Sequence, residues 1–304
     1  RGGSTSHAAV VARGLGLPCV VGMAELAVDL AKRTMKVGDK TLKEGGTISI
    51  DGTTGEVFLG ALPTIAADYE KEKELHQILA WADEIRTLGV WVNADTPEEC
   101  VRARRFGAEG VGLARTEHMF REAERLPYVQ AMILAADETE RRKHLKKLLP
   151  FQTKDFREIY KAMDGLPVVI RLIDPPLHEF LREIDIKELA TITGLTPAKA
   201  RQHVESRRAQ LEEENPMLGL RGCRLLLVFP EILEMQIRAI LGAAADVAAK
   251  GVVAKPEIMM PLVGTMGELE RLRTQVFEVA AAVEKERGTK IPFKFGTMIE
   301  IPRA

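Results

Sequence analysis

From residue 89 onward, short apolar runs alternate with longer stretches in which apolar residues recur at helical spacing. The short runs, which predict strands, are Val90–Asn93, Gly110–Leu113, Pro167–Leu172, Glu257–Pro261 and Phe293–Ile299. The helical stretches include Pro97–Phe106, Phe229–Lys250 and Met266–Arg287. This strand–helix alternation predicts an α/β fold with a parallel sheet and crossover helices.

Polar residues gather directly after the predicted strands, and in a (β/α)8 barrel the loops at that end form the active site. Longer helical insertions interrupt the alternation at Thr116–Leu166 and Asp174–Asn215. Five strands are clear and a sixth is expected near Leu218, which is too few to close a barrel. We therefore expect an incomplete (β/α)8 TIM barrel over residues 89–304. Its unpaired edge favours an excerpt from a longer protein.

Residues 1–61 differ from the barrel region because they are rich in glycine and in short elements. Ser4–Arg13 has the pattern of a short helix whose start would be capped by Thr5 or Ser6. Cys19–Val21 predicts a short strand. We expect a small β/α domain here.

Two β-prone runs, Thr47–Ile50 and Glu56–Leu59, flank an Asp-Gly-Thr-Thr-Gly turn and predict a hairpin. After the hairpin, apolar residues from Leu75 to Ile85 recur at intervals of three and four, which predicts an amphipathic helix. We expect residues 62–88 to be a helical linker between the two domains.

Composition and charge exclude several classes of protein. The chain has 43 Lys and Arg against 44 Asp and Glu, whereas a nucleic-acid binder needs a basic excess. No uncharged apolar run approaches the roughly 20 residues of a membrane helix, and no secretory signal is visible. Cys19, Cys100 and Cys223 lie far apart, which argues against a disulfide framework or a zinc site. A reducing cytoplasm is therefore expected.

The densest motif is Gly-Gly-Ser-Thr-Ser-His-Ala-Ala-Val-Val-Ala-Arg, at Gly2–Arg13. His7 would stand in the first turn of the predicted helix, beside unpaired amide groups and the positive end of the helix dipole. This environment suits an anion and would stabilise a phosphoryl group on the imidazole. Gly2 and Gly3 lack side chains and would let a phosphate approach. The alternative is that His7 only helps the helix to begin.

Gly2–Arg13 closely resembles the phosphohistidine segment of the phosphoenolpyruvate-utilising enzymes. Asp51–Val57 resembles the end of their swivelling phosphohistidine domain. The resemblance implies that His7 is the phosphorylated carrier and that residues 1–61 are the C-terminal part of this mobile domain. Thr5 stands where plant members carry a regulatory threonine that is phosphorylated, and helix capping is its alternative role.

Three further motifs, Gly112–Phe120, Arg171–Phe180 and Asn215–Arg224, resemble one branch of the family in particular. That branch interconverts ATP, phosphate and pyruvate with AMP, pyrophosphate and phosphoenolpyruvate through a phosphohistidine. The alternatives are a phosphoenolpyruvate synthase, an Enzyme I-type phosphotransferase, a Mg-dependent C–C lyase or a non-catalytic phosphoacceptor. The phosphohistidine segment counts against the lyase, which has no use for His7.

Arginines near strand ends suit such a substrate, because phosphoenolpyruvate carries a phosphate and a carboxylate that guanidinium binds bidentately. Arg115 follows one predicted strand and Arg171 closes another, so both would point into the barrel mouth. The resemblance implies that they bind the phosphoryl and carboxylate groups. Arg221 also lies in a matching motif, but its assignment as a substrate-binding residue has less support. For any single arginine, a surface ion pair is the alternative role.

Glu300 follows another predicted strand, where a carboxylate suits Mg²⁺. The resemblance implies that Glu300 binds substrate and Mg²⁺ together with a second carboxylate. That ligand and the cysteine that protonates the enolate are expected beyond Ala304, and a nucleotide-binding domain before Arg1. A homodimeric full-length enzyme that binds neither nucleic acid nor membrane is also implied. The remaining histidines are expected to be solvated (His76, His144, His203) or to support the mouth (His118, His178).

Overall fold

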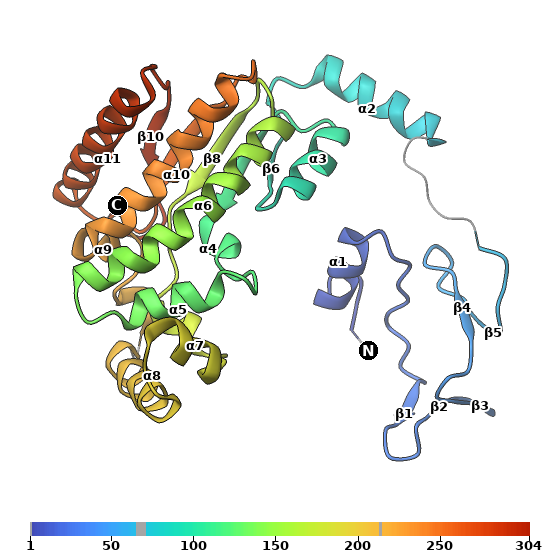
Figure 1. Cartoon of the computed structure of the whole chain (residues 1–304). Helices are drawn as coiled ribbons and strands as arrows, with labels where there is room; N and C mark the ends of the chain where they lie inside the picture. Colours follow the sequence, from blue (N-terminus) through green and yellow to red (C-terminus); the bar gives the residue numbers. More distant parts are fainter. Residues whose placement is uncertain (1, 65–70, 213–214) are drawn as a thin grey trace. The chain divides into compact units, whose positions relative to one another are not determined.

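The structure, a computed structural model, describes residues 2–64, 71–212 and 215–304. The chain divides into two compact units, Arg1–Thr87 and Leu88–Ala304. Both contain helices and strands, and the larger unit has the parallel sheet that the alternating pattern predicts (Figure 1). The α/β fold class is therefore confirmed.

The N-terminal unit begins with helix α1 (His7–Gly14) and continues with two small antiparallel sheets. The strands are β1 (Ala27–Asp29), β2 (Thr34–Val37), β3 (Lys40–Lys43), β4 (Ile48–Ile50) and β5 (Val57–Leu59). β1, β2 and β3 pair in sequence order. β4 and β5 pair with each other, which confirms the predicted hairpin.

Turn residues explain two of the hairpins, β2–β3 and β4–β5. Gly38, between β2 and β3, has a φ of 56°, a left-handed value that glycine adopts without steric cost. Between β4 and β5, the Asp51 carboxylate accepts hydrogen bonds from the backbone N–H groups of Thr53 (2.8 Å) and Thr54 (3.2 Å). These backbone hydrogen bonds lower the pKa of Asp51, so the carboxylate stays charged and continues to hold the turn.

Two local predictions for this unit are wrong. Cys19–Val21 forms no strand, because no strand in the described part of the unit pairs with it and an unpaired run cannot form a ladder. Helix α1 begins at His7 with Ser6 in the N-cap position, but the Ser6 side chain makes no capping hydrogen bond. Thr5 lies one residue further from the helix and is exposed, so it is not the cap either.

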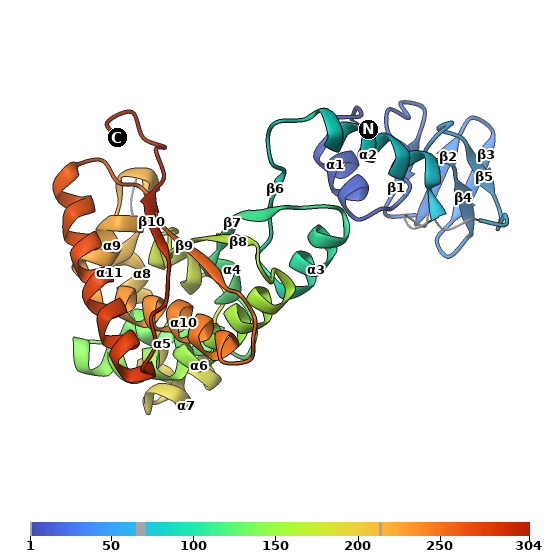
Figure 2. The same cartoon turned by 90° about the horizontal axis from the view of Figure 1, so that it is seen from above.

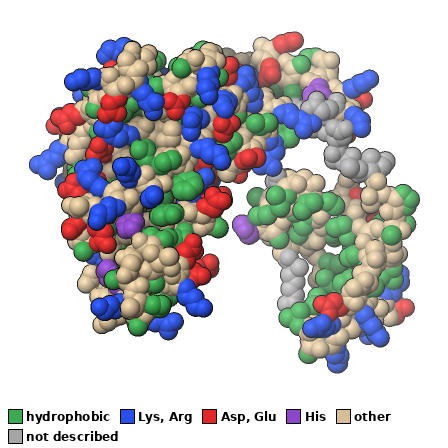
Figure 3. Space-filling view, viewed as in Figure 1, with side chains coloured by type: hydrophobic (Ala, Val, Ile, Leu, Met, Phe, Trp, Pro, Cys, Tyr) green, Lys and Arg blue, Asp and Glu red, His purple; other side chains and the backbone are tan. Residues whose placement is uncertain are grey.

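Helix α2 (Lys73–Ile85) confirms the amphipathic helix predicted from the spacing of apolar residues. None of its residues is buried. Its exposed apolar side chains are Leu75, Ile78, Leu79, Trp81 and Ile85. Among the described residues before Leu88, Ala9 is the only buried hydrophobic residue, and this unit shows broad apolar areas at its surface (Figure 3). The N-terminal unit therefore buries little apolar surface by itself.

The C-terminal unit is built on a five-stranded parallel sheet with the order β10-β9-β8-β7-β6. The strands are β6 (Trp91–Asn93), β7 (Gly110–Arg115), β8 (Pro167–Arg171), β9 (Lys255–Met260) and β10 (Lys294–Thr297). Each observed strand overlaps one of the five predicted strands. The sequence alternation therefore located the whole described sheet.

Helices connect the strands as crossovers and insertions. They are α3 (Pro97–Arg105), α4 (Thr116–Met119), α5 (Leu126–Leu134), α6 (Glu138–Ala162), η2 (Leu177–Leu181), α7 (Ile186–Thr193), α8 (Pro197–Leu211), η3 (Pro216–Leu218), α9 (Gly222–Val228), α10 (Pro230–Ala248) and α11 (Met266–Arg287). Both predicted helical insertions are confirmed. The sixth strand expected near Leu218 is wrong, because that segment is the short 3-10 helix η3.

Helices α6, α10 and α11 cover one face of the sheet (Figures 1 and 2). Along β8, Val168 and Ile170 are fully buried while Val169 and Arg171 are half-buried, as expected when side chains alternate between the two faces. The covered face forms the hydrophobic core with buried residues of the helices, such as Leu148 and Phe156. The polar residues that follow the strands lie at the carboxyl ends of this sheet.

Within the described residues, β6 and β10 are the two edges of the sheet and do not pair with each other, so no closed barrel is formed. This agrees with the expected incomplete barrel. In the same described ranges, no helix combines the length and the apolar character that crossing a membrane requires.

Candidate active site

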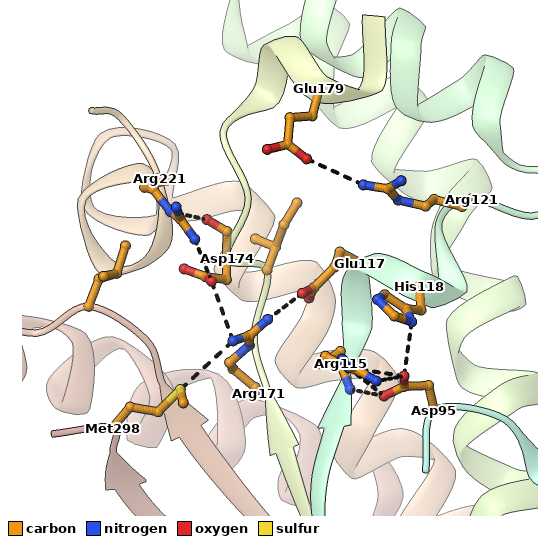
Figure 4. A network of polar contacts seen from close by, with 12 residues as sticks. Asp95, Arg115, Glu117, His118, Arg121, Arg171, Asp174, Glu179, Arg221 and Met298 are labelled. Carbon is orange, nitrogen blue, oxygen red and sulfur yellow. Dashed lines mark hydrogen bonds and ion pairs between the residues drawn. The ribbon is translucent and has the colours of Figure 1, made fainter. Parts of the chain in front are cut away.

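The carboxyl ends of the parallel strands carry a cluster of arginines and carboxylates (Figure 4). Arg115, the last residue of β7, contacts Asp95, which follows β6. The Asp95 carboxylate accepts hydrogen bonds from Arg115 Nε (3.0 Å), Nη2 (2.7 Å) and backbone N–H (2.7 Å), and His118 Nδ1 lies 2.9 Å from it. The hydrogen bond to Asp95 raises the pKa of Arg115, which keeps its guanidinium charged.

Arg171, the last residue of β8, lies between two carboxylates. Its Nη2 donates to Glu117 Oε1, and its Nη1 lies 3.4 Å from Asp174 Oδ2. Arg221 Nη2 donates to the same Asp174 oxygen at 2.7 Å. The side chains of Arg171 and Arg221 are only 12% and 14% exposed. These pairs are therefore shielded from water, and the alternative of an exposed surface ion pair does not describe them.

Three buried polar atoms in this cluster have no hydrogen-bond partner in the described part of the chain. They are Arg171 Nε, Glu117 Oε2 and Asp174 Oδ1. Buried polar groups are nearly always paired, and leaving one unpaired costs about 1–3 kcal/mol. A donor and two acceptors left over in one connected network are typical of a place where a polar ligand binds.

The charges of the cluster nearly cancel. The guanidinium groups of the three arginines are matched by the carboxylates of three acidic residues, and a further carboxylate, Glu300, follows β10. The pairs are Arg115 with Asp95, Arg171 with Glu117, and Arg221 with Asp174. A multiply charged anion would therefore bind here most favourably together with an additional cation.

Glu300 is fixed through one of its two carboxylate oxygens. Its Oε1 accepts a hydrogen bond from the backbone N–H of Leu262 (2.7 Å). Leu262 has a φ of 59°, in the left-handed region, and the thiol of Cys223 donates to its carbonyl oxygen at 3.2 Å. Both polar backbone groups of Leu262, which is in a strained conformation, are therefore hydrogen-bonded: its N–H group to Glu300 and its carbonyl group to Cys223.

Glu300 suits a hard cation because such ions prefer oxygen ligands, and its Oε2 makes no hydrogen bond to the described residues. Within those same ranges, no group of three or more His, Cys, Asp or Glu side chains is placed to hold a metal. The residues present therefore fit a Mg²⁺ ion by supplying one carboxylate ligand, with the other positions left to substrate, water or further protein groups.

His7 is the first residue of α1 and its side chain is exposed. The amide groups of this first turn have no partner within the helix, which suits an anion on the imidazole. Gly2 has a φ of 99°, a value that favours glycine, whereas a Cβ at Gly3 would meet nothing within 4 Å. The space around Gly3 is therefore open to an incoming group. Thr5 is also exposed.

Cys100 and Cys223 are fully buried, and burial raises the pKa of their thiols to about 12 and about 11. Buried thiols of this kind are inert. His144 was expected to be solvated, and this prediction is wrong: it is 9% exposed on a helix that packs against α5 and α10, and burial lowers its pKa. His203 is half-buried and not fully solvated.

Two family models match the chain. The PEP-binding domain of PEP-utilising enzymes matches residues 69–304, and the mobile domain of the same enzymes matches residues 1–55. The chain belongs to the PEP-utilising enzymes. The family named from the His7 motif and the strand-end motifs is thereby confirmed.

Relatives of this PEP-utilising chain include proteins named "Pyruvate, phosphate dikinase". The protein from Giardia intestinalis is 51% identical over 304 residues, and that from Rhizobium meliloti is 49% identical over 307 residues. The Arabidopsis thaliana protein, named "Pyruvate, phosphate dikinase 1, chloroplastic", is 50% identical over 312 residues. All of this chain is covered in each case, but only 31–34% of each relative. The chain thus spans about a third of these relatives.

The structure brings Arg115, Arg171 and Arg221 of this PEP-utilising chain to the carboxyl ends of the strands. Glu300 follows β10, which is separated from β8 by β9. Arg221, which had less support from the sequence than Arg115 and Arg171, shares an oxygen atom of Asp174 with Arg171. The carboxylate partners Asp95, Glu117 and Asp174 were not named from the sequence. The rule that identified the arginines would have identified these carboxylates as well, because each follows a predicted strand by two to four residues.

Proposed function

We propose that this chain is the phosphoryl carrier and part of the substrate-binding region of a phosphotransferase. The complete enzyme would interconvert ATP, phosphate and pyruvate with AMP, pyrophosphate and phosphoenolpyruvate. About 50% identity over the whole chain to proteins named "Pyruvate, phosphate dikinase" supports this activity. The structural observation that carries the proposal is the convergence of Arg115, Arg171 and Arg221 at the strand ends.

The arginines would bind and orient phosphoenolpyruvate. Arg171 and Arg115 are each preorganised by carboxylates, so little side-chain freedom is lost when an anion binds. The uncommitted Nε of Arg171 offers a donor for an oxygen of the substrate phosphate or carboxylate. As negative charge moves between substrate and carrier, fixed guanidinium groups would stabilise it without reorganising.

Mg²⁺ would be held in part by Glu300, together with a second carboxylate outside this chain. When bound, the ion would supply the positive charge that the balanced arginine–carboxylate cluster lacks for an anionic substrate. The backbone of Leu262 keeps Glu300 in place through its N–H group. The described part of the chain therefore contributes one oriented ligand and not a complete metal site.

His7 would carry the phosphoryl group between the pyruvate site and a separate nucleotide site. Its exposed position at the start of α1 supports a role in which the imidazole meets partners in turn. We assign residues 1–61 to the mobile phosphohistidine domain, 62–88 to a helical linker that acts as the swivel, and 89–304 to the PEP-binding barrel. Dividing the reaction into two transfers replaces one difficult exchange by two in-line steps. Thr5 is proposed as a regulatory phosphorylation site.

Two alternatives within the family are a phosphoenolpyruvate synthase and an Enzyme I-type phosphotransferase. Both would also use the His7 carrier. A Mg-dependent C–C lyase would explain the arginines and Glu300 but would leave the segment around His7 without a role. The names of the relatives favour the dikinase over all three.

The proposed partners are pyruvate and phosphoenolpyruvate at the strand ends, and ATP, AMP, phosphate and pyrophosphate at a nucleotide-binding domain outside this chain. Neither nucleic acid nor a membrane is proposed as a partner. We propose a homodimeric, cytoplasmic enzyme, with the free cysteines favouring a reducing compartment. The word "chloroplastic" in the name of the Arabidopsis thaliana relative describes the location of that protein and not of this chain.

The product released from ATP tests this proposal. The complete enzyme is incubated with ATP, Mg²⁺ and pyruvate, with and without inorganic phosphate. A dikinase requires the added phosphate and releases pyrophosphate. Release of inorganic phosphate would assign a phosphoenolpyruvate synthase, and nucleotide-independent transfer from phosphoenolpyruvate to a protein acceptor would assign an Enzyme I.

A further inference from the structure

A polar cavity of about 330 Å³ lies among the helices of the C-terminal unit. It is formed by the end of α5, the start of α6, one side of α8 and the junction of α9 and α10. Its polar lining residues are Arg141, His203, Ser206, Arg207 and Gln210. None of these belongs to the cluster at the strand ends, so the cavity is separate from the proposed active site.

Helix α8 supplies most of the polar lining from one face. His203, Ser206, Arg207 and Gln210 are separated by three, one and three positions, which places them on adjacent turns of the same side. They present an imidazole, a hydroxyl, a guanidinium and an amide to a common space. Each of these groups can donate a hydrogen bond to an oxyanion.

The positive charges of the two arginines in the cavity are not equally balanced by carboxylates. Arg141 Nη1 donates to the buried Glu231 at 2.6 Å, and its guanidinium carbon lies 4.2 Å from the centre of the Phe229 ring. Arg207 forms no ion pair with any carboxylate in the described part of the chain. Its Nε donates to the Ile133 carbonyl and its Nη1 to Gln210 Oε1, both at 3.3 Å, which leaves Nη2 without a partner there.

The positive charge of Arg207 is therefore poorly accommodated. Burial and, to a smaller extent, the charge of Arg141 lower the pKa of Arg207. The carboxylate of Glu140, at the start of α6, accepts a hydrogen bond from the Ala136 backbone N–H at 2.8 Å. It is therefore held by the backbone before α6 and forms no ion pair with Arg207. An anion between the two guanidinium groups would relieve this imbalance.

We propose that this cavity binds a phosphate group, either as inorganic phosphate or as part of a small phosphate monoester. Paired guanidinium groups with additional hydroxyl and amide donors match the several oxygens of a phosphate better than one carboxylate does. The volume lies at the lower end of the range of about 300–1,000 Å³ that small-molecule sites occupy. It has room for a short organic group next to the phosphate.

Calorimetric titration of the 304-residue chain with glycerol 3-phosphate, and separately with inorganic phosphate, tests this site. Arg207→Gln is compared with Arg201→Gln, a control that removes the same charge from an exposed position of α8 outside the cavity lining. We expect the parent and Arg201→Gln to bind alike and Arg207→Gln to bind about tenfold more weakly or not at all. The arm with the tighter binding identifies free or esterified phosphate as the ligand.

Circular dichroism checks that Arg207→Gln folds, and Ser206→Ala provides a second variant at an exposed position. Loss of the Ser206 hydroxyl is expected to weaken phosphate binding about threefold to tenfold. Unchanged affinity in a folded Arg207→Gln, or in Ser206→Ala if Arg207→Gln does not fold, overturns the proposal. Binding that is lost in Arg171→Lys but kept in Arg207→Gln also overturns it, because the phosphate would then occupy the strand ends.

Discussion

Arg171 Nη1 lies 3.4 Å from the carboxylate of Asp174, three residues further along the chain. The same carboxylate oxygen accepts a hydrogen bond from Arg221 Nη2, which comes from the start of α9. One buried acidic side chain thus orients two guanidinium groups from different elements. Arg171 also contacts Glu117, and its Nε has no hydrogen-bond partner among the described residues.

In the proposed complete enzyme, replacing Arg171 by lysine should damage the pyruvate half-reaction selectively. Lysine keeps the charge, but a single ammonium group cannot contact Glu117 and Asp174 and still donate to a substrate oxygen. We expect a roughly hundredfold loss in phosphoenolpyruvate-dependent labelling, as when one preorganised donor is removed. ATP/AMP exchange, measured in the same preparation, should be unchanged. An equal fall in that exchange would show that Arg171 is structural.

In the proposed complete enzyme, replacing Asp174 by asparagine should weaken the use of phosphoenolpyruvate without removing an arginine. Because Asp174 is 8% exposed and paired with Arg171 and Arg221, its charge fixes both guanidinium groups. We expect kcat/KM for phosphoenolpyruvate to fall about tenfold or more. Asp39→Asn, an exposed residue in the turn between β2 and β3, makes the same charge change and serves as the control. Equal kinetics in the two variants would refute the orienting role of Asp174.

In the proposed complete enzyme, replacing His7 by alanine should abolish both half-reactions and leave the fold intact. The side chain is exposed at the first residue of α1, so no buried contact depends on it. Circular dichroism should therefore match the parent while ATP/AMP exchange and pyruvate exchange both disappear. Retained ATP/AMP exchange would be incompatible with His7 as the carrier.

Cys100 should make stability fall at alkaline pH. Its thiol ionises near 9.0 when exposed in the unfolded chain but near pH 12 in the folded protein. Above pH 9 the unfolded state loses this proton first, so unfolding becomes more favourable as pH rises. Between pH 8 and pH 10 the free energy of unfolding, measured with urea, should fall by about 1.4 kcal/mol more in the parent than in Cys100→Ala. Equal losses would show that Cys100 ionises alike in both states.

The sequence predicted those parts of the fold that depend on periodicity. The five parallel strands and the helix Lys73–Ile85 follow from local patterns of apolar residues. Leu218 and Cys19–Val21 were misassigned because a short apolar run becomes a strand only when another strand pairs with it, and pairing depends on distant residues.

The candidate site was predicted in part. Arg115 and Arg171 were identified because polar residues at the ends of barrel strands are expected to line the active site. This rule needs only the local sequence. Arg221 and Asp174 are 47 positions apart, so their contact depends on the path of the chain between them, which no local pattern encodes. The burial of His144 likewise results from the packing of α6 against α5 and α10 and not from its own charged surroundings in the sequence.

The most direct test of the central claim is phosphohistidine formation from phosphorus-labelled phosphoenolpyruvate and Mg²⁺. The label is identified by its lability in acid and located by peptide mass spectrometry. In the complete enzyme we expect it on His7. The 304-residue chain alone should remain unlabelled, because its described residues supply a single carboxylate ligand for the ion and form no closed barrel that would exclude water. Label on another residue, or equal labelling of the short chain, would contradict this account.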